Sequence, residues 1–224
     1  MSADVRQAPG AATRVKICGI RRAEDARLAA DFGAAAVGFV FWPESPRFID
    51  PYRAKPIVRA LPPFVAAVGV FVNQPPEFVM GVAGLLNLGA IQLHGDESVA
   101  EYLRSSFRLI KAVPVTGAFD PAALAAIPPQ VTVLLDAHDP VRRGGTGRPI
   151  DWARAAAAAR LRPVVLSGGL TPDNVADAVN AVQPYAIDVS SGVETAPGVK
   201  DRERLRALFA ALAGRRATTT HAEP

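Results

Sequence analysis

Residues 14–41 have the sequence RVKICGIRRAEDARLAADFGAAAVGFVF, which changes from a strand pattern to a helix pattern and back again. The apolar run Val15–Cys18 predicts a buried strand, the alanine-rich segment Ala23–Phe32 predicts a helix, and Ala36–Phe41 predicts a second strand. A strand, a helix and a strand joined by short connections are typical of a βαβ unit, whose two strands run parallel. Both strands are nearly continuous apolar runs, which indicates a sheet that is buried on both faces.

The same unit repeats along the rest of the chain. The other strand candidates are Phe64–Val72, Ala90–Leu93, Leu109–Val113, Val131–Asp136, Val164–Ser167 and Ala186–Ser190. The other helix candidates are Arg53–Ala60, Pro76–Leu86, Ser98–Ser105, Pro121–Ala126, Asp151–Arg160, Pro172–Val182 and Asp201–Ala213. Eight such units within about 200 residues predict an α/β protein of the single-domain (β/α)8 TIM barrel class. We expect the barrel to occupy residues 13–214, and residues 1–12 and 215–224 to be disordered tails.

The composition is that of a globular protein with a large core, because 50% of the 224 residues are hydrophobic and 21% are charged. The single cysteine excludes an internal disulfide framework, and no apolar run resembles a signal peptide or a membrane span. We therefore expect a cytoplasmic protein with no membrane partner. The formal net charge is +4, but the arginines are spread along the chain, so we expect no nucleic-acid partner.

Cys18 ends the first predicted strand, and α/β barrels carry their active sites at the carboxyl ends of their strands. A thiol there can act as a base or nucleophile, although a lone cysteine is more often a small buried hydrophobe. Lys16 has the same parity as Cys18, so both side chains should point into the barrel. A buried lysine needs a partner, and Asp188, on the strand that closes the barrel against the first, is the natural candidate. A cation below the thiol would favour the thiolate.

Three glycine-rich loops follow the sixth, seventh and eighth predicted strands. Their candidate phosphate-binding residues are Gly145, Thr146, Gly147, Ser167, Gly168, Gly169, Ser190, Ser191 and Gly192. Glycines let backbone N–H groups close on a phosphate, and hydroxyl groups complete the cradle. Any one of these loops could simply turn the chain, but three at successive strand ends predict a phosphate site, as barrels often have after strands seven and eight.

Arg47, Asp136 and His94 are the other polar candidates at strand ends. Arg47 lies in a proline-framed loop after the second strand, away from the phosphate loops, and suits bidentate binding of a carboxylate. Asp136 follows an otherwise apolar strand and would be partly desolvated, which favours a general acid over a simple cap. The chain has only three histidines, so we expect no zinc set and assign His94 a supporting role beside the catalytic residues.

The ordered set of strand-end segments resembles the phosphoribosylanthranilate isomerase family of tryptophan biosynthesis over about residues 14–212. The segments are Lys16–Ile20, Gly38–Phe41, Ser45–Arg47, Gly69–Val72, Gln92–Gly95, Leu135–Asp136, Gly144–Gly147, Ser167–Leu170 and Asp188–Glu194. The resemblance implies an Amadori rearrangement of N-(5-phosphoribosyl)anthranilate to 1-(2-carboxyphenylamino)-1-deoxyribulose 5-phosphate, with no cofactor and no metal. It implies Cys18 as general base, Asp136 as general acid and Arg47 as the contact for the anthranilate carboxylate. We expect a monomer or homodimer.

Two other functions are compatible with such a barrel. The first is another phosphosugar isomerase, either of the histidine pathway or with two substrates, which would be expected to use an aspartate where this chain has Cys18. The second is a phosphate-binding barrel without catalysis, against which the presence of both Cys18 and Asp136 argues.

Overall fold

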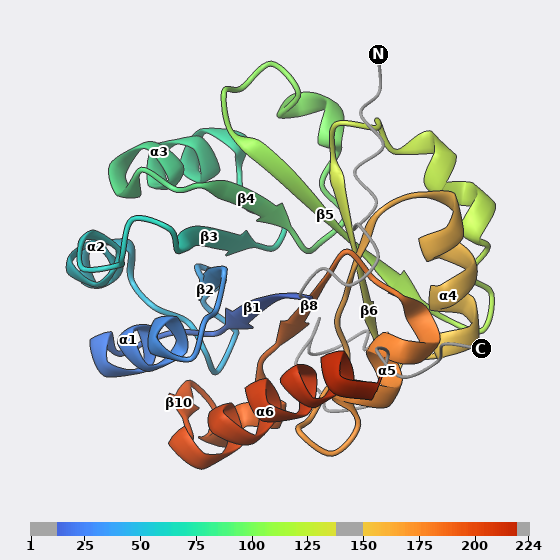
Figure 1. Ribbon diagram of the computed structural model, residues 1–224. Coiled ribbons are helices and arrows are strands. Elements are labelled where there is room, and N and C mark those ends of the chain that lie inside the picture. The colour runs from blue at the N-terminus through green and yellow to red at the C-terminus, as the bar shows by residue number, and fades with distance from the viewer. Residues whose placement is uncertain (1–12, 138–149, 219–224) are drawn as a thin grey trace.

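The computed structural model describes residues 13–137 and 150–218 of the chain. These residues form a closed barrel of eight parallel strands with helices around the outside (Figure 1). The strands are β1 (Arg14–Cys18), β2 (Ala36–Val40), β3 (Ala66–Phe71), β4 (Ala90–Leu93), β5 (Arg108–Val115), β6 (Thr132–Ala137), β7 (Val164–Leu166) and β8 (Ala186–Val189). Because β8 pairs with β1 in parallel, the sheet has no free edge, and the predicted TIM barrel is confirmed.

The long helices lie between successive strands and cover the barrel. They are α1 (Ala23–Asp31), α2 (Pro51–Arg59), α3 (Pro76–Leu86), α4 (Trp152–Leu161), α5 (Val175–Val182) and α6 (Arg202–Thr218). Three of them begin where an aspartate accepts hydrogen bonds from first-turn N–H groups: Asp50 caps α2, Asp151 caps α4 and Asp201 caps α6. Helix α5 starts at Val175, three residues later than predicted. In the part of the chain that the structure describes, no helix has the length and apolar character needed to span a membrane.

Two predicted helices are shorter or tighter than expected. The segment 98–105 contains only the 3-10 helix η1 (Val99–Glu101), and the segment 121–126 is the 3-10 helix η2 (Pro121–Ala126). Serines at both ends of the first segment favour turns over helix interiors. Pro128 and Pro129 stop the second segment after two 3-10 turns.

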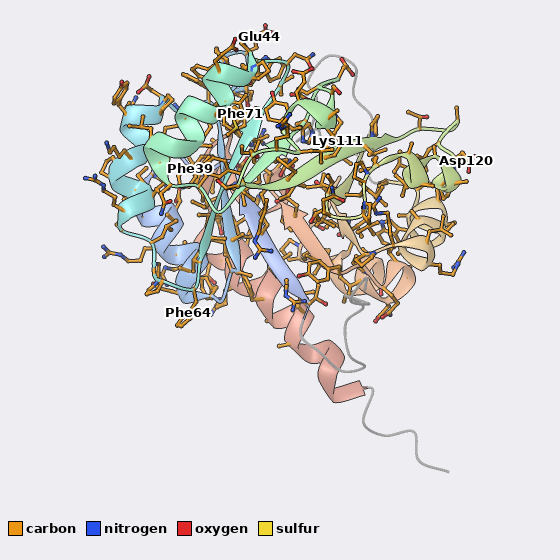
Figure 2. The ribbon with its side chains drawn as sticks, turned by 90° about the horizontal axis from the view of Figure 1, so that it is seen from above. Phe39, Glu44, Phe64, Phe71, Lys111 and Asp120 are labelled. Atoms are coloured by element: carbon orange, nitrogen blue, oxygen red, sulfur yellow. The ribbon has the colours of Figure 1, made fainter. Side chains whose placement is uncertain are left out.

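Other boundaries also differ from the prediction. Phe64 is 95% exposed and precedes β3, and Figure 2 shows it at the edge of the molecule, whereas Phe39 and Phe71 lie inside. Helix α6 continues to Thr218, so residues 215–218, expected to begin a disordered tail, are helical; Arg and Ala are good helix formers. Residues 1–12 and 219–224 lie outside the described residues.

A short antiparallel hairpin was not predicted. After β8 the chain forms the 3-10 helix η3 (Ser191–Val193) and then the strands β9 (Glu194–Ala196) and β10 (Val199–Lys200). Gly198 at the turn has φ of +78°, a conformation that favours glycine. Strands of two and three residues are too short to give a periodic pattern, so only the Pro197-Gly198 pair signalled the turn.

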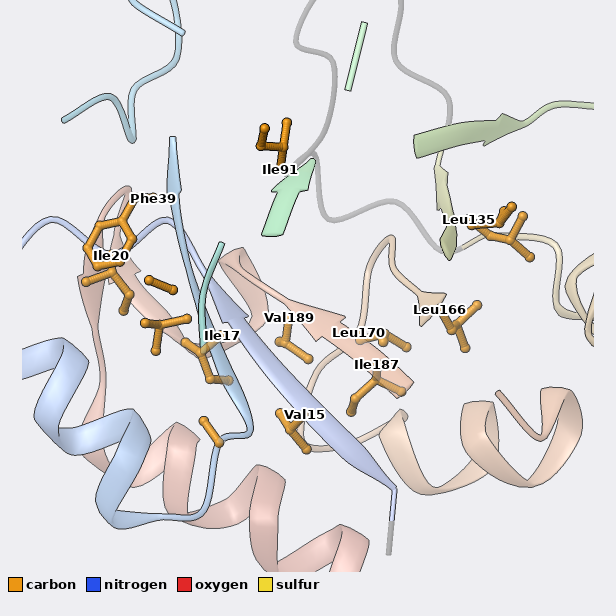
Figure 3. Packing of buried hydrophobic residues seen from close by; sticks show 14 of the residues in the cluster. Val15, Ile17, Ile20, Phe39, Ile91, Leu135, Leu166, Leu170, Ile187 and Val189 are labelled. Carbon is orange, nitrogen blue, oxygen red and sulfur yellow. The ribbon is translucent and has the colours of Figure 1, made fainter. Parts of the chain in front are cut away.

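Side chains alternate between the two faces of the barrel wall. Val15, Ile17, Ile187 and Val189 belong to the large cluster between strands and helices, and Figure 3 shows them on β1 and β8 within that cluster. The residues between them in sequence therefore point into the barrel. Part of the interior is filled by apolar residues, including Ala112, Leu134, Val165 and Ala186, while Cys18, Val40 and Val70 form a separate cluster.

Candidate active site

The alternation brings the predicted thiol and its lysine together inside the barrel. Lys16 is paired in register with Asp188 of β8, and its Nζ lies 2.9 Å from Asp188 Oδ2, with both side chains buried. Gly38 of β2 faces Cys18 in register, and a Cβ placed on it would lie 2.8 Å from Cys18 Sγ and 3.0 Å from Lys16 Nζ. The bare backbone of Gly38 therefore makes room for both groups. The predicted ion pair between Lys16 and Asp188 is present.

Effects of opposite sign act on the pKa of the Cys18 thiol. Burial raises the pKa of Cys18; Lys16 and, more weakly, Lys200 lower it, while Asp188 raises it. The sign of the Lys16 effect is as predicted, but burial outweighs it and the net pKa of the thiol is raised. Burial alone would lower the pKa of Lys16, but Asp188 and Cys18 together raise it above the ordinary value. The resting site therefore pairs a charged ammonium with a protonated thiol.

Asp136 points inward from β6 and is buried next to His94. His94 Nε2 lies 3.2 Å from Asp136 Oδ2, and Gln92 Nε2 lies 2.9 Å from His94 Nδ1. The side-chain amide of Gln92 faces Nδ1 of His94, and Nε2 of the same ring faces the carboxyl group of Asp136. Gln92 and His94 thus form a chain, from the end of β4, that orients Asp136.

Arg47 is buried, at 9% exposure, and is already paired within the protein. Its Nε donates to both carboxylate oxygens of Glu194, each at 3.1 Å, and its Nη2 donates to Oε2 at 2.7 Å. A Cβ on Gly19, directly after Cys18, would lie 2.5 Å from Arg47 Cδ. Arg47, the residue predicted to bind a substrate carboxylate, therefore lies against the end of β1. Glu194 fixes one edge of its guanidinium.

Lys200 completes this buried group. Its Nζ donates to Glu194 Oε1 at 2.6 Å, to the Cys18 carbonyl at 2.5 Å and to the Ser190 carbonyl at 3.4 Å. Burial alone would raise the pKa of Glu194, but Arg47 and Lys200 together lower it. Burial lowers the pKa of Lys200, and Glu194 opposes this only in part. Sequence reasoning gave neither Glu194 nor Lys200 a role, although Glu194 ends a segment that carries the family resemblance and the two residues flank a Pro-Gly turn.

The loops after β7 and β8 touch each other and the end of β6. Gly168 and Gly169 have φ of +88° and +66°, and a Cβ on Gly168 would lie 2.8 Å from the Ala137 nitrogen. A Cβ on Gly192 would overlap the Leu170 carbonyl oxygen. At these points only glycine allows the backbones to approach so closely. Ser190 Oγ donates to the Cys18 carbonyl at 3.1 Å, so this predicted phosphate ligand also bonds the end of β1.

The structure describes some of the remaining residues that were predicted to bind phosphate, but not all of them. Ser167 donates its N–H to the Leu135 carbonyl at 2.8 Å, which holds the β7 loop to β6. Ser191 and Gly192 line a cavity of about 650 Å³ together with Gly169 and with Arg204 of α6. Gly145, Thr146 and Gly147 lie outside the described residues.

The arrangement suits proton transfer on a small substrate with two anionic ends. A thiol on β1 and a carboxyl group on β6 point into the barrel from separated strands, an arginine lies after β2, and glycine loops follow β7 and β8. Within residues 13–137 and 150–218, no group of three or more His, Cys, Asp or Glu side chains is placed to hold a metal ion.

Comparison with known proteins places this barrel in a family. Residues 15–211 match the family model described as N-(5'phosphoribosyl)anthranilate (PRA) isomerase. The chain is 52% identical over 198 residues to N-(5'-phosphoribosyl)anthranilate isomerase of Citrifermentans bemidjiense, covering 88% of this chain and 96% of that protein.

Solved structures agree with this match. The phosphoribosyl anthranilate isomerase of Thermus thermophilus is 46% identical, has a TM-score of 0.82 and covers 90% of this chain and 99% of its own. A phosphoribosyl anthranilate isomerase in complex with reduced 1-(o-carboxyphenylamino)-1-deoxyribulose 5-phosphate is 42% identical, with a TM-score of 0.79 and the same coverage. The chain therefore belongs to the N-(5'-phosphoribosyl)anthranilate isomerase family, whose members are isomerases of tryptophan biosynthesis.

Proposed function

We propose that this chain converts N-(5-phosphoribosyl)anthranilate to 1-(2-carboxyphenylamino)-1-deoxyribulose 5-phosphate with Asp136 as general acid and Cys18 as general base. The observation that carries the proposal is the pair of buried proton-transfer groups, each with its own supporting chain: Lys16 and Asp188 for the thiol, His94 and Gln92 for the carboxyl group. Such support is what a positioned acid and base need.

The first step opens the sugar ring. Asp136 donates its proton to the ribose ring oxygen, the bond between that oxygen and C1' breaks, and the amine lone pair forms a C=N bond. The product is an iminium cation with a free hydroxyl group on C4'. The Nε2–H of His94 then donates to the carboxylate left on Asp136 and stabilises its charge.

The second step moves a proton from carbon. The iminium group acidifies the C2' hydrogen, and the Cys18 thiolate removes it to give an enolamine. Loss of the C2' hydroxyl proton and protonation of C1' give the ketone, so no atom is gained or lost. Since burial raises the pKa of Cys18, the thiolate is a minor form before the reaction starts; the thiol proton leaves to solvent, and the nearby iminium charge favours this ionisation.

Anions at the two ends of the substrate hold it between these groups. We assign the phosphate to the glycine loops after β6, β7 and β8, comprising Gly145, Thr146, Gly147, Ser167, Gly168, Gly169, Ser190, Ser191 and Gly192, and the anthranilate carboxylate to Arg47. Backbone N–H groups and a bidentate guanidinium fit these two anions. No nucleic acid takes part in this assignment, and a cytoplasmic location suits the small-molecule substrate.

For the oligomeric state we propose a monomer or homodimer. The phosphoribosylanthranilate isomerase of Thermotoga maritima is dimeric, and monomers have been generated from it. Sedimentation of this chain at several concentrations distinguishes the two states, and a larger assembly would contradict the proposal.

An isomerase assay on freshly generated phosphoribosylanthranilate tests the chemistry. Removing a positioned acid or base typically costs about 10²- to 10⁴-fold in rate, so Cys18→Ala and Asp136→Asn should each lose activity by that order. Turnover of both variants at the wild-type rate would disprove the assignment. Arg47→Ala should weaken substrate binding more than binding of inorganic phosphate, and an equal loss for both ligands would disprove the carboxylate contact.

A further inference from the structure

The β9–β10 hairpin joins two parts of the site that are far apart in sequence. Glu194 bonds Arg47, which is 147 residues earlier in the chain, and Lys200 bonds the Cys18 carbonyl, 182 residues earlier. The Lys200 side chain is 0% exposed and that of Glu194 is 3% exposed. Two oppositely charged side chains buried so fully are costly unless their geometry is well satisfied.

We infer that Glu194 and Lys200 are positioning residues that fix the Arg47 guanidinium for an aromatic carboxylate and hold the main chain of Cys18 in a fixed relation to it. The inference rests on the proposed role of Arg47. By this inference the β9–β10 hairpin takes part in substrate recognition: Glu194 acts on Arg47, and Lys200 acts on Cys18.

The geometry of the guanidinium supports the role of Glu194. Arg47 has five N–H groups in a plane, and Glu194 takes those of Nε and one of Nη2 along one side. The end of the guanidinium, formed by Nη1 and the other N–H of Nη2, has the spacing for a second bidentate carboxylate. Because the plane is fixed by the first pair, the second carboxylate binds without ordering a flexible side chain.

The charges of the cluster point to the same ligand. Arg47 and Lys200 are cations and Glu194 is the anion between them, so the three buried groups carry a net charge of +1. A buried surplus charge is unfavourable unless an anion compensates it. A substrate carboxylate at Arg47 supplies that anion, so the cluster is balanced only when an anionic ring is bound. The cluster therefore favours anthranilate over an uncharged aniline.

Lys200 extends the effect to the base. Its ammonium group holds the carbonyl of Cys18 and lies close enough to lower the pKa of the thiol. The stem of Arg47 packs against Gly19, the residue after Cys18. The buried cluster of Arg47, Glu194 and Lys200 therefore sets the position of the Arg47 guanidinium relative to the Cys18 thiol.

Binding of two matched ligands tests the role of Glu194. The first is reduced 1-(o-carboxyphenylamino)-1-deoxyribulose 5-phosphate, and the second is the same compound with a phenyl ring and no carboxylate. In Glu194→Gln, Kd for the first ligand should rise about tenfold, because the loss of the pair that fixes the guanidinium plane outweighs the added positive charge of the cluster, while Kd for the second stays within about twofold. Since both ligands bind the same folded protein, the ratio of their Kd values does not depend on the fraction of protein that is folded. An unchanged ratio would overturn the inference.

A double substitution shows whether Glu194 acts through Arg47. In the background of Arg47→Ala, Glu194→Gln should leave the ratio of the two Kd values unchanged, because the group that it positions is gone. A further loss of the same size would mean that Glu194 acts independently, against the inference. If Arg47→Ala alone leaves the ratio unchanged, the proposed function of Arg47 fails instead, so the two failures are distinguishable.

Lys200→Met provides an independent variant and a readout that a merely structural hairpin would not move. Alkylation of Cys18, the only cysteine, should then need a higher pH, because a cation that favours the thiolate is lost. We expect kcat to fall together with this shift, whereas Glu194→Gln should act mainly on KM. A thiol titration identical to that of the wild type in folded Lys200→Met would refute the role of Lys200.

Discussion

Replacing Lys16 with methionine tests how the buried pair beneath Cys18 contributes to folding and to the state of the thiol. The two charges are 2.9 Å apart and nearly inaccessible to water. Asp188 Oδ1 is buried, and among the described residues it has no hydrogen-bond partner, so the carboxylate depends on the ammonium group. Methionine keeps much of the length of lysine and leaves that carboxylate uncompensated. Removing one partner of a buried ion pair costs about 3–5 kcal/mol, which is a large part of the stability of a typical domain.

A second substitution separates the loss of the pair from the loss of packing. In Lys16→Met with Asp188→Val, both charges are gone, and replacing a buried ion pair by apolar side chains is often close to neutral. We therefore expect the double variant to recover most of the free energy of unfolding. For the thiol, the single variant loses a group that lowers its pKa and keeps one that raises it, so the pKa of Cys18 rises. The double variant loses both, and its thiol should titrate between the other two proteins.

Urea unfolding and pH-dependent alkylation measure the two effects. The unfolding midpoint should fall in Lys16→Met with the slope unchanged, and alkylation reports Cys18 alone because the chain has no other cysteine. A destabilisation below about 1 kcal/mol in the single variant would show that the pair is not buried as described. A thiol titration that stays in place or moves to lower pH would refute the electrostatic reasoning.

Three further predictions concern the same region. Gly38→Ala should lower kcat and stability, because the new methyl group would lie 2.8 Å from Cys18 Sγ. The control, Gly81→Ala in α3, has nothing within 4 Å of the new methyl group and should stabilise the protein by up to about 1 kcal/mol. Equal effects of the two substitutions on the free energy of unfolding would contradict this reasoning. Gly192→Ala should raise KM and the Kd of inorganic phosphate, since its methyl group overlaps the Leu170 carbonyl, and unchanged phosphate binding would count against a phosphate site there. Because the thiol pKa is raised, kcat/KM should still be increasing with pH at the ordinary pKa of a cysteine; a profile that is already level well below it would show that the thiolate is not the base.

The period of the strands explains why so much of the site could be predicted from the sequence. Side chains alternate along a strand, and a closed parallel barrel gathers all carboxyl ends at one mouth, so Lys16, Cys18, Asp136 and Asp188 could be placed from their positions alone. The pairing of Lys16 with Asp188 followed because closure makes the first and last strands neighbours. These arguments need only local pattern and topology.

The roles of Glu194 and Lys200 could not be predicted in this way. They lie on strands of three and two residues, and their partners are set by how the hairpin folds back over β1. The same limit applied to the segment 98–105, where a helical composition gives only one short 3-10 turn. Local pattern predicted the sign of the Lys16 effect on the thiol but not the net pKa of Cys18, because that depends on the extent of burial, which a sequence does not give.

The distribution of charge around the thiol explains why the groups that bind the two substrate anions are separate from the base. A base that works as a thiolate is weakened by any nearby anion, yet the proposed substrate carries an anion at each end. Lys16 is paired with Asp188 beneath Cys18, and Lys200 is paired with Glu194, so each lysine near the base already has an anionic partner. The surplus of +1 lies at Arg47, and the glycine loops offer N–H groups without a formal charge. Each anion is therefore compensated where it binds, and the only charge that forms next to the thiol during the reaction is the iminium cation, which favours the thiolate when the C2' proton must be removed.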